Sequence, residues 1–270
     1  MKRDLKIMAK EAVPGGDYDK VVILGKGHIT GDLNCDSFAS AGAGQVDGAL
    51  TCEKKLECSG SLGVEGTLTC GELEVNGSFR GSGAVRCEAL ELNGSAKLAD
   101  DLTCRGDAEI NGKLELAGDF TGADLECSGS MHLSGSAKCA DVEIAGKCRV
   151  EKDFEADAIR VDGTIQVPGL LNAERIQLYA SPSSVLGEIG GSEISIGRDS
   201  ARRHFHFGEG ENLQVRVIEG DTVTLAYTTA DVVRGRDVTI GKGCRIGRVE
   251  YTERFEAAEG TVQESCRTAE

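Results

Sequence analysis

The stretch that decides the fold is Leu68–Ala84, LTCGELEVNGSFRGSGA, a 17-residue unit that recurs with variations through most of the chain. Apolar or small residues alternate with polar ones in three short segments of it, and a period of two predicts β-strands. Gly77 and Gly83 fall between segments, where the chain must turn. A short fixed repeat of this kind predicts a β-solenoid in which each repeat forms one coil.

A column of glycines shows the length of the repeat most directly. Its steps are 17 or 18 residues, at Gly25, Gly42, Gly60, Gly77, Gly94, Gly112, Gly129, Gly146 and Gly163. Three segments per coil predict a triangular cross-section, and the mixed step lengths fit poorly with the strict hexads of left-handed β-helices. We therefore predict an all-β fold, a single-stranded right-handed parallel β-helix. A second column, with positive φ angles expected, comprises Gly31, Gly48, Gly66, Gly83, Gly118 and Gly135.

Composition agrees with a narrow all-β stack and excludes some function classes. The 270 residues include 37 glycines, three prolines and no tryptophan, and aromatic residues make up 4%, as a thin core requires. The formal net charge of −15 argues against nucleic acid as a partner, because phosphate binding needs a clustered basic surface. Anionic membranes are disfavoured for the same reason.

The regularity of the repeat varies along the chain and divides it into five segments. We expect a flexible segment over residues 1–18, a regular β-helix over 19–180 and terminal coils over 222–251. Residues 181–221 break the pattern and are interpreted as an irregular coil with an insertion. The charged residues 252–270 are interpreted as a flexible tail.

Six of the eleven cysteines fall at one repeat position: Cys35, Cys52, Cys70, Cys87, Cys104 and Cys139. We interpret them as a ladder of small buried side chains, since free cysteine is among the most buried residue types. No segment resembles a secretory signal, so a reducing cytoplasm is the expected compartment. Zinc is disfavoured because ligands stacked in a dry core lack room for tetrahedral geometry. No catalytic, cofactor or metal residues are predicted.

One outward-facing column is uniformly acidic: Glu57, Glu74, Glu91, Glu109, Glu126 and Glu143. The first interpretation is a solvated stripe that keeps an exposed sheet soluble. The second is a docking strip for a basic partner or for divalent cations. A glycosidase is disfavoured, because its two carboxylates need different environments, whereas a repeated column gives its members similar ones.

A compact cluster of basic and aromatic residues lies within the irregular region. It consists of Arg202, Arg203, His204, Phe205, His206 and Phe207. Alternation places the two phenylalanines on one face of a strand, so a strand with buried Phe205 and Phe207 is expected, and a local protein or lipid contact is the alternative. A zinc site there lacks a visible third ligand.

The two ends of a solenoid expose unpaired backbone groups and an apolar cross-section unless they are capped. Neither end of this sequence shows a long amphipathic helix that would serve as a cap. We therefore predict end-to-end polymerisation through Val21, Ile23 and Ile29 at one end and Val238, Ile240 and Ile246 at the other.

Several stretches resemble the bactofilins, bacterial polymer-forming cytoskeletal proteins, over roughly residues 19–251. The most specific are GLLNAERIQLY at Gly169–Tyr179 and VVRGRDVTIGKGCRIG at Val232–Gly247. The resemblance implies a right-handed β-helix, filaments formed without nucleotide, and scaffold roles in cell shape, envelope-enzyme placement or motility. It implies the chain itself as first partner, then cell-envelope or motility proteins, and a cytoplasmic, membrane-proximal location. It carries no catalytic residues.

Two other functions fit a solenoid. One is a monomeric or dimeric interaction platform that uses the acidic column or the Arg202–Phe207 cluster. The other is a hexapeptide-repeat acyltransferase, because IGKGCRIG at Ile240–Gly247 locally resembles that repeat and a histidine such as His28 could serve as base. Acetyl-CoA binding would distinguish an acyltransferase from a scaffold.

Overall fold

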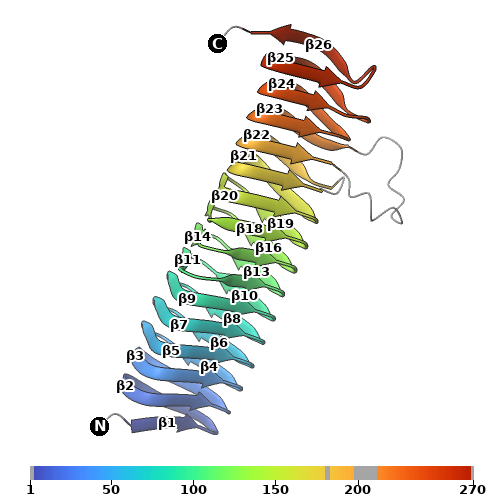
Figure 1. Ribbon diagram of the computed structural model, residues 1–270. Helices are drawn as coiled ribbons and strands as arrows, with labels where there is room; N and C mark the ends of the chain where they lie inside the picture. The colour runs from blue at the N-terminus through green and yellow to red at the C-terminus, as the bar shows by residue number, and fades with distance from the viewer. Residues whose placement is uncertain (1–2, 180–182, 198–211, 269–270) are drawn as a thin grey trace. The chain divides into compact units, whose positions relative to one another are not determined.

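The computed structural model describes residues 3–179, 183–197 and 212–268. The chain forms two compact units, residues 1–136 and 137–270. Each unit is a stack of parallel strands wound as a β-helix (Figure 1). The predicted all-β, right-handed parallel β-helix is confirmed. Among the described residues there is no helix long and apolar enough to cross a membrane.

Unit 1 has two long strands near its start, of 14 and 15 residues, and continues with shorter ones. The strands are β1 (Arg3–Ile7), β2 (Lys10–Ile23), β3 (Lys26–Ser40), β4 (Ala43–Val46), β5 (Leu50–Cys58), β6 (Ser61–Val64), β7 (Leu68–Val75), β8 (Ser78–Gly81), β9 (Val85–Leu92), β10 (Ser95–Leu98), β11 (Leu102–Cys104), β12 (Ala108–Ile110), β13 (Lys113–Leu116), β14 (Phe120–Gly122), β15 (Leu125–Cys127) and β16 (Ser130–Leu133). Strands one repeat apart pair in register, as in Leu50 opposite Leu68 and Leu68 opposite Val85. Equivalent residues of successive repeats therefore stack directly on one another.

Unit 2 begins with short strands and continues with long ones. The strands are β17 (Ala137–Lys138), β18 (Asp141–Ile144), β19 (Lys147–Val150), β20 (Phe154–Val161), β21 (Thr164–Leu178), β22 (Val185–Ile196), β23 (Leu213–Leu225), β24 (Thr228–Ile240), β25 (Arg245–Ala257) and β26 (Val262–Arg267). The long strands pair in parallel, for example Val223 with Val238.

Three of the segments expected to be irregular contain paired strands. Residues 3–18 lie in β1 and β2, and residues 252–267 lie in β25 and β26. Within 181–221, β22 pairs with β23 from Val185 opposite Gln214 to Ile196 opposite Leu225. The sequence rule fails here because the regularly spaced glycine columns run only from Gly25 to Gly163, whereas the alternation of inward apolar residues continues beyond them.

The core is a column of apolar side chains in which large and small residues compensate one another. Phe79 is 1% exposed and stacks between Leu62 and Ala96. Phe120 occupies the space beside Gly122, where an added Cβ would lie 2.9 Å from the phenylalanine Cζ. The phenylalanine is paired with a glycine because close packing leaves no room for two bulky groups.

The corner glycines are needed for close approach rather than for unusual backbone angles. A Cβ on Gly94 would overlap the carbonyl oxygen of Gly77 in the neighbouring coil. In the second glycine column Gly31 alone has a positive φ, 89°. The expectation of positive φ at Gly48, Gly66, Gly83, Gly118 and Gly135 is therefore wrong, and these glycines are required because the adjacent coil lies too close for a side chain.

This difference gives a test with a matched control. Gly94→Ala should lower the free energy of unfolding by roughly 1–3 kcal/mol, because backbone must move to relieve the overlap. Gly63→Ala should cost much less, because its Cβ would meet the mobile end of the Gln45 side chain. Urea unfolding followed by circular dichroism measures both, and equal losses would contradict this account of the corners.

Candidate functional site

The acidic column predicted from the sequence is a stacked row in unit 1. Glu57, Glu74, Glu91, Glu109 and Glu126 pair one after another in register, on β5, β7, β9, β12 and β15. Neighbouring strands are about 4.8 Å apart, so the carboxylates follow one another at that spacing. The sixth residue, Glu143, lies on β18 of unit 2, where its in-register neighbour is Arg160.

An asparagine ladder runs beside the acidic row and supplies hydrogen-bond donors to it. The Nδ2 of Asn93 donates to Oδ1 of Asn76 at 3.0 Å and to Oε1 of Glu91 at 2.7 Å. The Nδ2 of Asn111 donates to Oδ1 of Asn93 at 3.2 Å. These amides orient the carboxylates and satisfy some of their lone pairs, which the sequence pattern alone does not reveal.

A lysine sits at one end of the row and neutralises part of it. The Nζ of Lys55 lies 2.6 Å from Oε1 of Glu72 and 2.5 Å from Oε2 of Glu74. Its hydrogen bond lowers the pKa of Glu74, with a further contribution from Asn76, and the two carboxylates raise the pKa of Lys55. Oxygens of Glu72, Glu74 and Glu91 lie within 4.8 Å of one another, a spacing that could hold a cation. The ammonium group of Lys55 already provides positive charge there.

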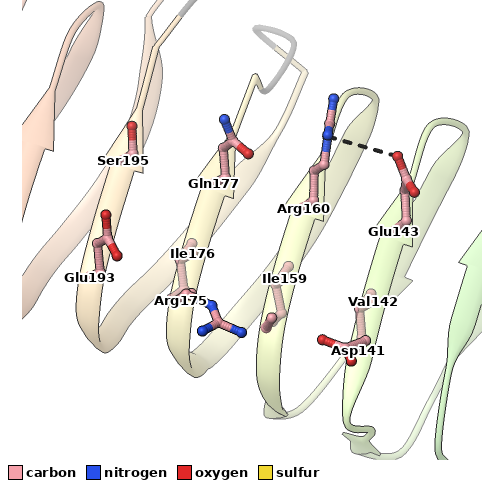
Figure 2. A pocket seen from close by; sticks show the side chains of 11 residues that line it. Asp141, Val142, Glu143, Ile159, Arg160, Arg175, Ile176, Gln177, Glu193 and Ser195 are labelled. Atoms are coloured by element: carbon pink, nitrogen blue, oxygen red, sulfur yellow. Dashed lines mark ion pairs between the residues drawn. The ribbon is translucent and has the colours of Figure 1, made fainter.

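A shallow hollow in unit 2, of about 480 Å³, presents both signs of charge (Figure 2). Two rows of outward side chains border it, Asp141, Ala158, Arg175 and Glu193 in one and Glu143, Arg160, Gln177 and Ser195 in the other. Ala158 is the smallest side chain in the first row and lies between Asp141 and Arg175 in the register. Arg160 Nε lies 3.8 Å from Glu143 Oε1, a loose pair. Val142, Ile159 and Ile176 lie beneath these rows with their side chains buried in the core, so a partner would meet the mixed charges of the outward rows.

The residues predicted to form the end surfaces lie one coil inside the outermost described strands. Val21, Ile23, Ile29, Val238, Ile240 and Ile246 are each at most 1% exposed. At one end Leu5, Ile7 and Val13 cover them, and at the other Phe255, Ala257 and Val262 do so. The covering residues repeat 16 or 17 positions from those they cover, which is the signal that could have located them. A role for the six residues in polymerisation stays a prediction.

The other candidate residues are not brought into a common site. His28 is half exposed, and its Nε2 lies 2.7 Å from Oδ2 of Asp47. The basic and aromatic cluster of Arg202, Arg203, Phe205 and Phe207 lies outside the described residues.

Replacing Lys55 tests the electrostatics of the acidic row. In Lys55→Gln the pKa of the Glu74 carboxyl should rise toward its ordinary value, because the ammonium donor is lost. A depressed folded-state pKa stabilises the fold above the unfolded pKa, so this contribution is lost as pH falls below about 4.5. Carboxyl-carbon NMR titration measures the shift. Lys54→Gln, which removes the 3.2 Å pair with Asp36, is the control and should leave Glu74 unchanged.

Comparison with known proteins connects part of the chain to one family. Residues 21–119 match the bactofilin family, described as polymer-forming cytoskeletal. The uncharacterized protein YhbF of Bacillus subtilis strain 168 is 45% identical over 89 residues, which are 33% of this chain and 37% of the relative. The match thus spans little more than a third of YhbF. No solved structure matches the chain. The bactofilin resemblance is confirmed, and the stretches at Gly169–Tyr179 and Val232–Gly247 lie outside the matched residues.

Proposed function

We propose that this chain, which carries a bactofilin-family segment at residues 21–119, is a non-enzymatic cytoskeletal scaffold. It assembles end to end into filaments without nucleotide, in the cytoplasm, and positions partner proteins along its side faces. The observation that carries the proposal is the match to a polymer-forming family. The geometry of the two units supports it in the following ways.

The outermost strands of each unit support self-association. In the described part of the chain β1 pairs with β2 and with no other strand, and β26 likewise pairs with β25 alone. An edge strand presents unpaired N–H and C=O groups that can pair with another chain. Apolar residues lie beside these edges, among them half-buried Leu5, Val13, Phe255 and Val262. Full burial of such a side chain contributes about 1.5–3 kcal/mol.

The side faces support the positioning of partners. In unit 1 the acidic row offers a regular series of carboxylates to a basic segment. In unit 2 the mixed-charge hollow offers Arg175 in register with Glu193, and Asp141 two coils from Arg175 in the same row. Strand backbones within a face are paired with their neighbours, so a partner there would be recognised by side chains. The same faces favour the second candidate function, an interaction platform that does not polymerise.

Electron microscopy of the purified protein without nucleotide tests filament formation. We expect filaments for the wild type and their loss in Val13→Glu combined with Phe255→Glu, because a charge would be buried at each joint. Val185→Glu changes a valine that is 53% exposed within unit 2, and it should leave filaments intact. Discrete particles of wild type at high concentration would reject self-assembly and favour the platform.

A separate experiment tests partner docking on the acidic row. Glu74, Glu91 and Glu109 are replaced together by Gln, which keeps their size and removes three charges. Filaments should persist, because these residues lie on a side face, while capture of a Lys- and Arg-rich peptide should weaken at least tenfold. Glu174→Gln with Glu188→Gln and Glu219→Gln in unit 2 removes the same charge elsewhere. Equal weakening in both variants would identify a net-charge effect and reject the row as a docking site.

A further inference from the structure

Five buried cysteines form a continuous column inside unit 1, here called the cysteine column: Cys35, Cys52, Cys70, Cys87 and Cys104. Each lies in register with the next. All are free thiols and none is more than 5% exposed. The proposed scaffold function uses none of these sulfur atoms.

Packing does not explain why this position should carry a thiol. In unit 2 the corresponding repeat position holds Cys139 and then Ala156 and Ala173, which pair with each other. Both alanines are buried, at 7% and 3% exposure. A methyl group therefore suffices at this position in the fold, and the sulfur atoms of unit 1 are available for chemistry.

The thiols interact in pairs. A hydrogen bond with the Cys35 thiol lowers the pKa of Cys52, whose Sγ also lies 3.1 Å from the carbonyl oxygen of Lys55. Cys104 bonds in the same way with the Cys87 thiol, which lowers the pKa of Cys104 and raises that of Cys87. In the Cys87–Cys104 pair one thiol thus releases its proton more readily than the other, while burial raises the pKa of the intervening Cys70 to about 12.

The distance between neighbouring strands limits whether two stacked thiols can form a disulfide or bind a metal ion between them. Strands stack about 4.8 Å apart, whereas a disulfide needs Cβ atoms about 3.8 Å apart. Two collinear bonds from sulfur to a closed-shell metal ion, each about 2.3 Å, span about 4.6 Å. The strand spacing is therefore close to the span of a two-coordinate ion and longer than the Cβ separation of a disulfide.

We propose that the cysteine column binds soft monovalent cations such as Cu(I) and Ag(I), with one ion between Cys35 and Cys52 and one between Cys87 and Cys104. Soft thiolate ligands select such ions. One thiol of each pair loses its proton to solvent, the ion bonds to that thiolate and to the sulfur of the second thiol, and no electron is transferred. The metal cation replaces the proton that the thiol loses, so the net charge of the core does not change. A net charge in the core would be costly.

A path for the ion is provided by the corner beside the column. The pairing register shifts between Cys52 and Lys55, which marks a bulge in the strand. The Sγ of Cys52 lies 3.1 Å from the carbonyl oxygen of Lys55, within this corner. Local opening of one irregular corner would expose the thiols without unstacking the coils.

Native mass spectrometry of the full-length reduced protein with silver nitrate in chloride-free buffer tests the proposal. Cys52→Ala with Cys87→Ala leaves no two consecutive thiols in the column, and it should bind two fewer Ag(I) ions than the wild type. Cys58→Ala with Cys127→Ala is the matched control and should keep full uptake. It also removes two buried thiols, but Cys58 lies between Ser40 and Val75, and Cys127 pairs with Ile110.

Silver X-ray absorption gives an independent readout. The wild type should show two sulfur neighbours per ion. Equal uptake by the two double variants, or three or more sulfur neighbours, would overturn the proposal. If the first variant does not give the wild-type circular dichroism spectrum, Cys52→Ser with Cys87→Ser replaces it, since serine keeps the size but is a poor ligand for silver. Silver uptake is independent of filament formation, so either result can stand without the other.

Discussion

The constraint on which the rest of the structure depends is that each residue has, as its nearest non-local neighbour, the residue one repeat away. Parallel strands in register hold equivalent side chains about 4.8 Å apart, so each position of the repeat becomes a column. A residue type that recurs at one repeat position therefore packs against copies of itself. Leucine and valine columns pack well under this rule, and glycine columns let corner backbones approach closely. In a column of like charges the repulsion must be offset by groups outside the column. In a column of bulky side chains the excess volume must be accommodated by smaller neighbours.

The compensation takes a different form in each case. Bulky Phe79 has Ala96 above it, so the excess volume of one rung is accommodated in the next. The acidic row of unit 1 receives amide donors from the neighbouring asparagine ladder and a cation from Lys55. In unit 2 the row that begins at Glu143 changes residue type at each step instead. Stacked like charges are thus tolerated where a second column supplies donors, and avoided where none is present.

Periodicity in the sequence predicted the features that recur in every repeat. It missed the features found only where a repeat departs from the common pattern. The fold, the inward residues, the cysteine column and the acidic row could be predicted, because they follow from one period applied many times. The strands β1 and β26 were missed, because terminal repeats carry few glycines and many charges. Lys55 was missed because it lies at a bulge, where the register shifts and simple counting fails. The positive φ expected at Gly48 was wrong because sequence cannot separate a glycine needed for backbone angle from one needed for space.

Stacking in register also determines which surfaces can join two copies. On a side face, backbone N–H and C=O groups are paired with those of neighbouring coils. The exposed groups there are mainly charged side chains, which favour contact with solvent or with a specific partner. At an outermost strand the backbone groups lack a neighbour in the described chain, and they lie beside apolar residues such as Val13 and Phe255. A joint there must match several strand edges at once, which makes it selective for a surface of the same cross-section. For the proposed filament, this geometry favours joints at the outermost strands over joints on the side faces.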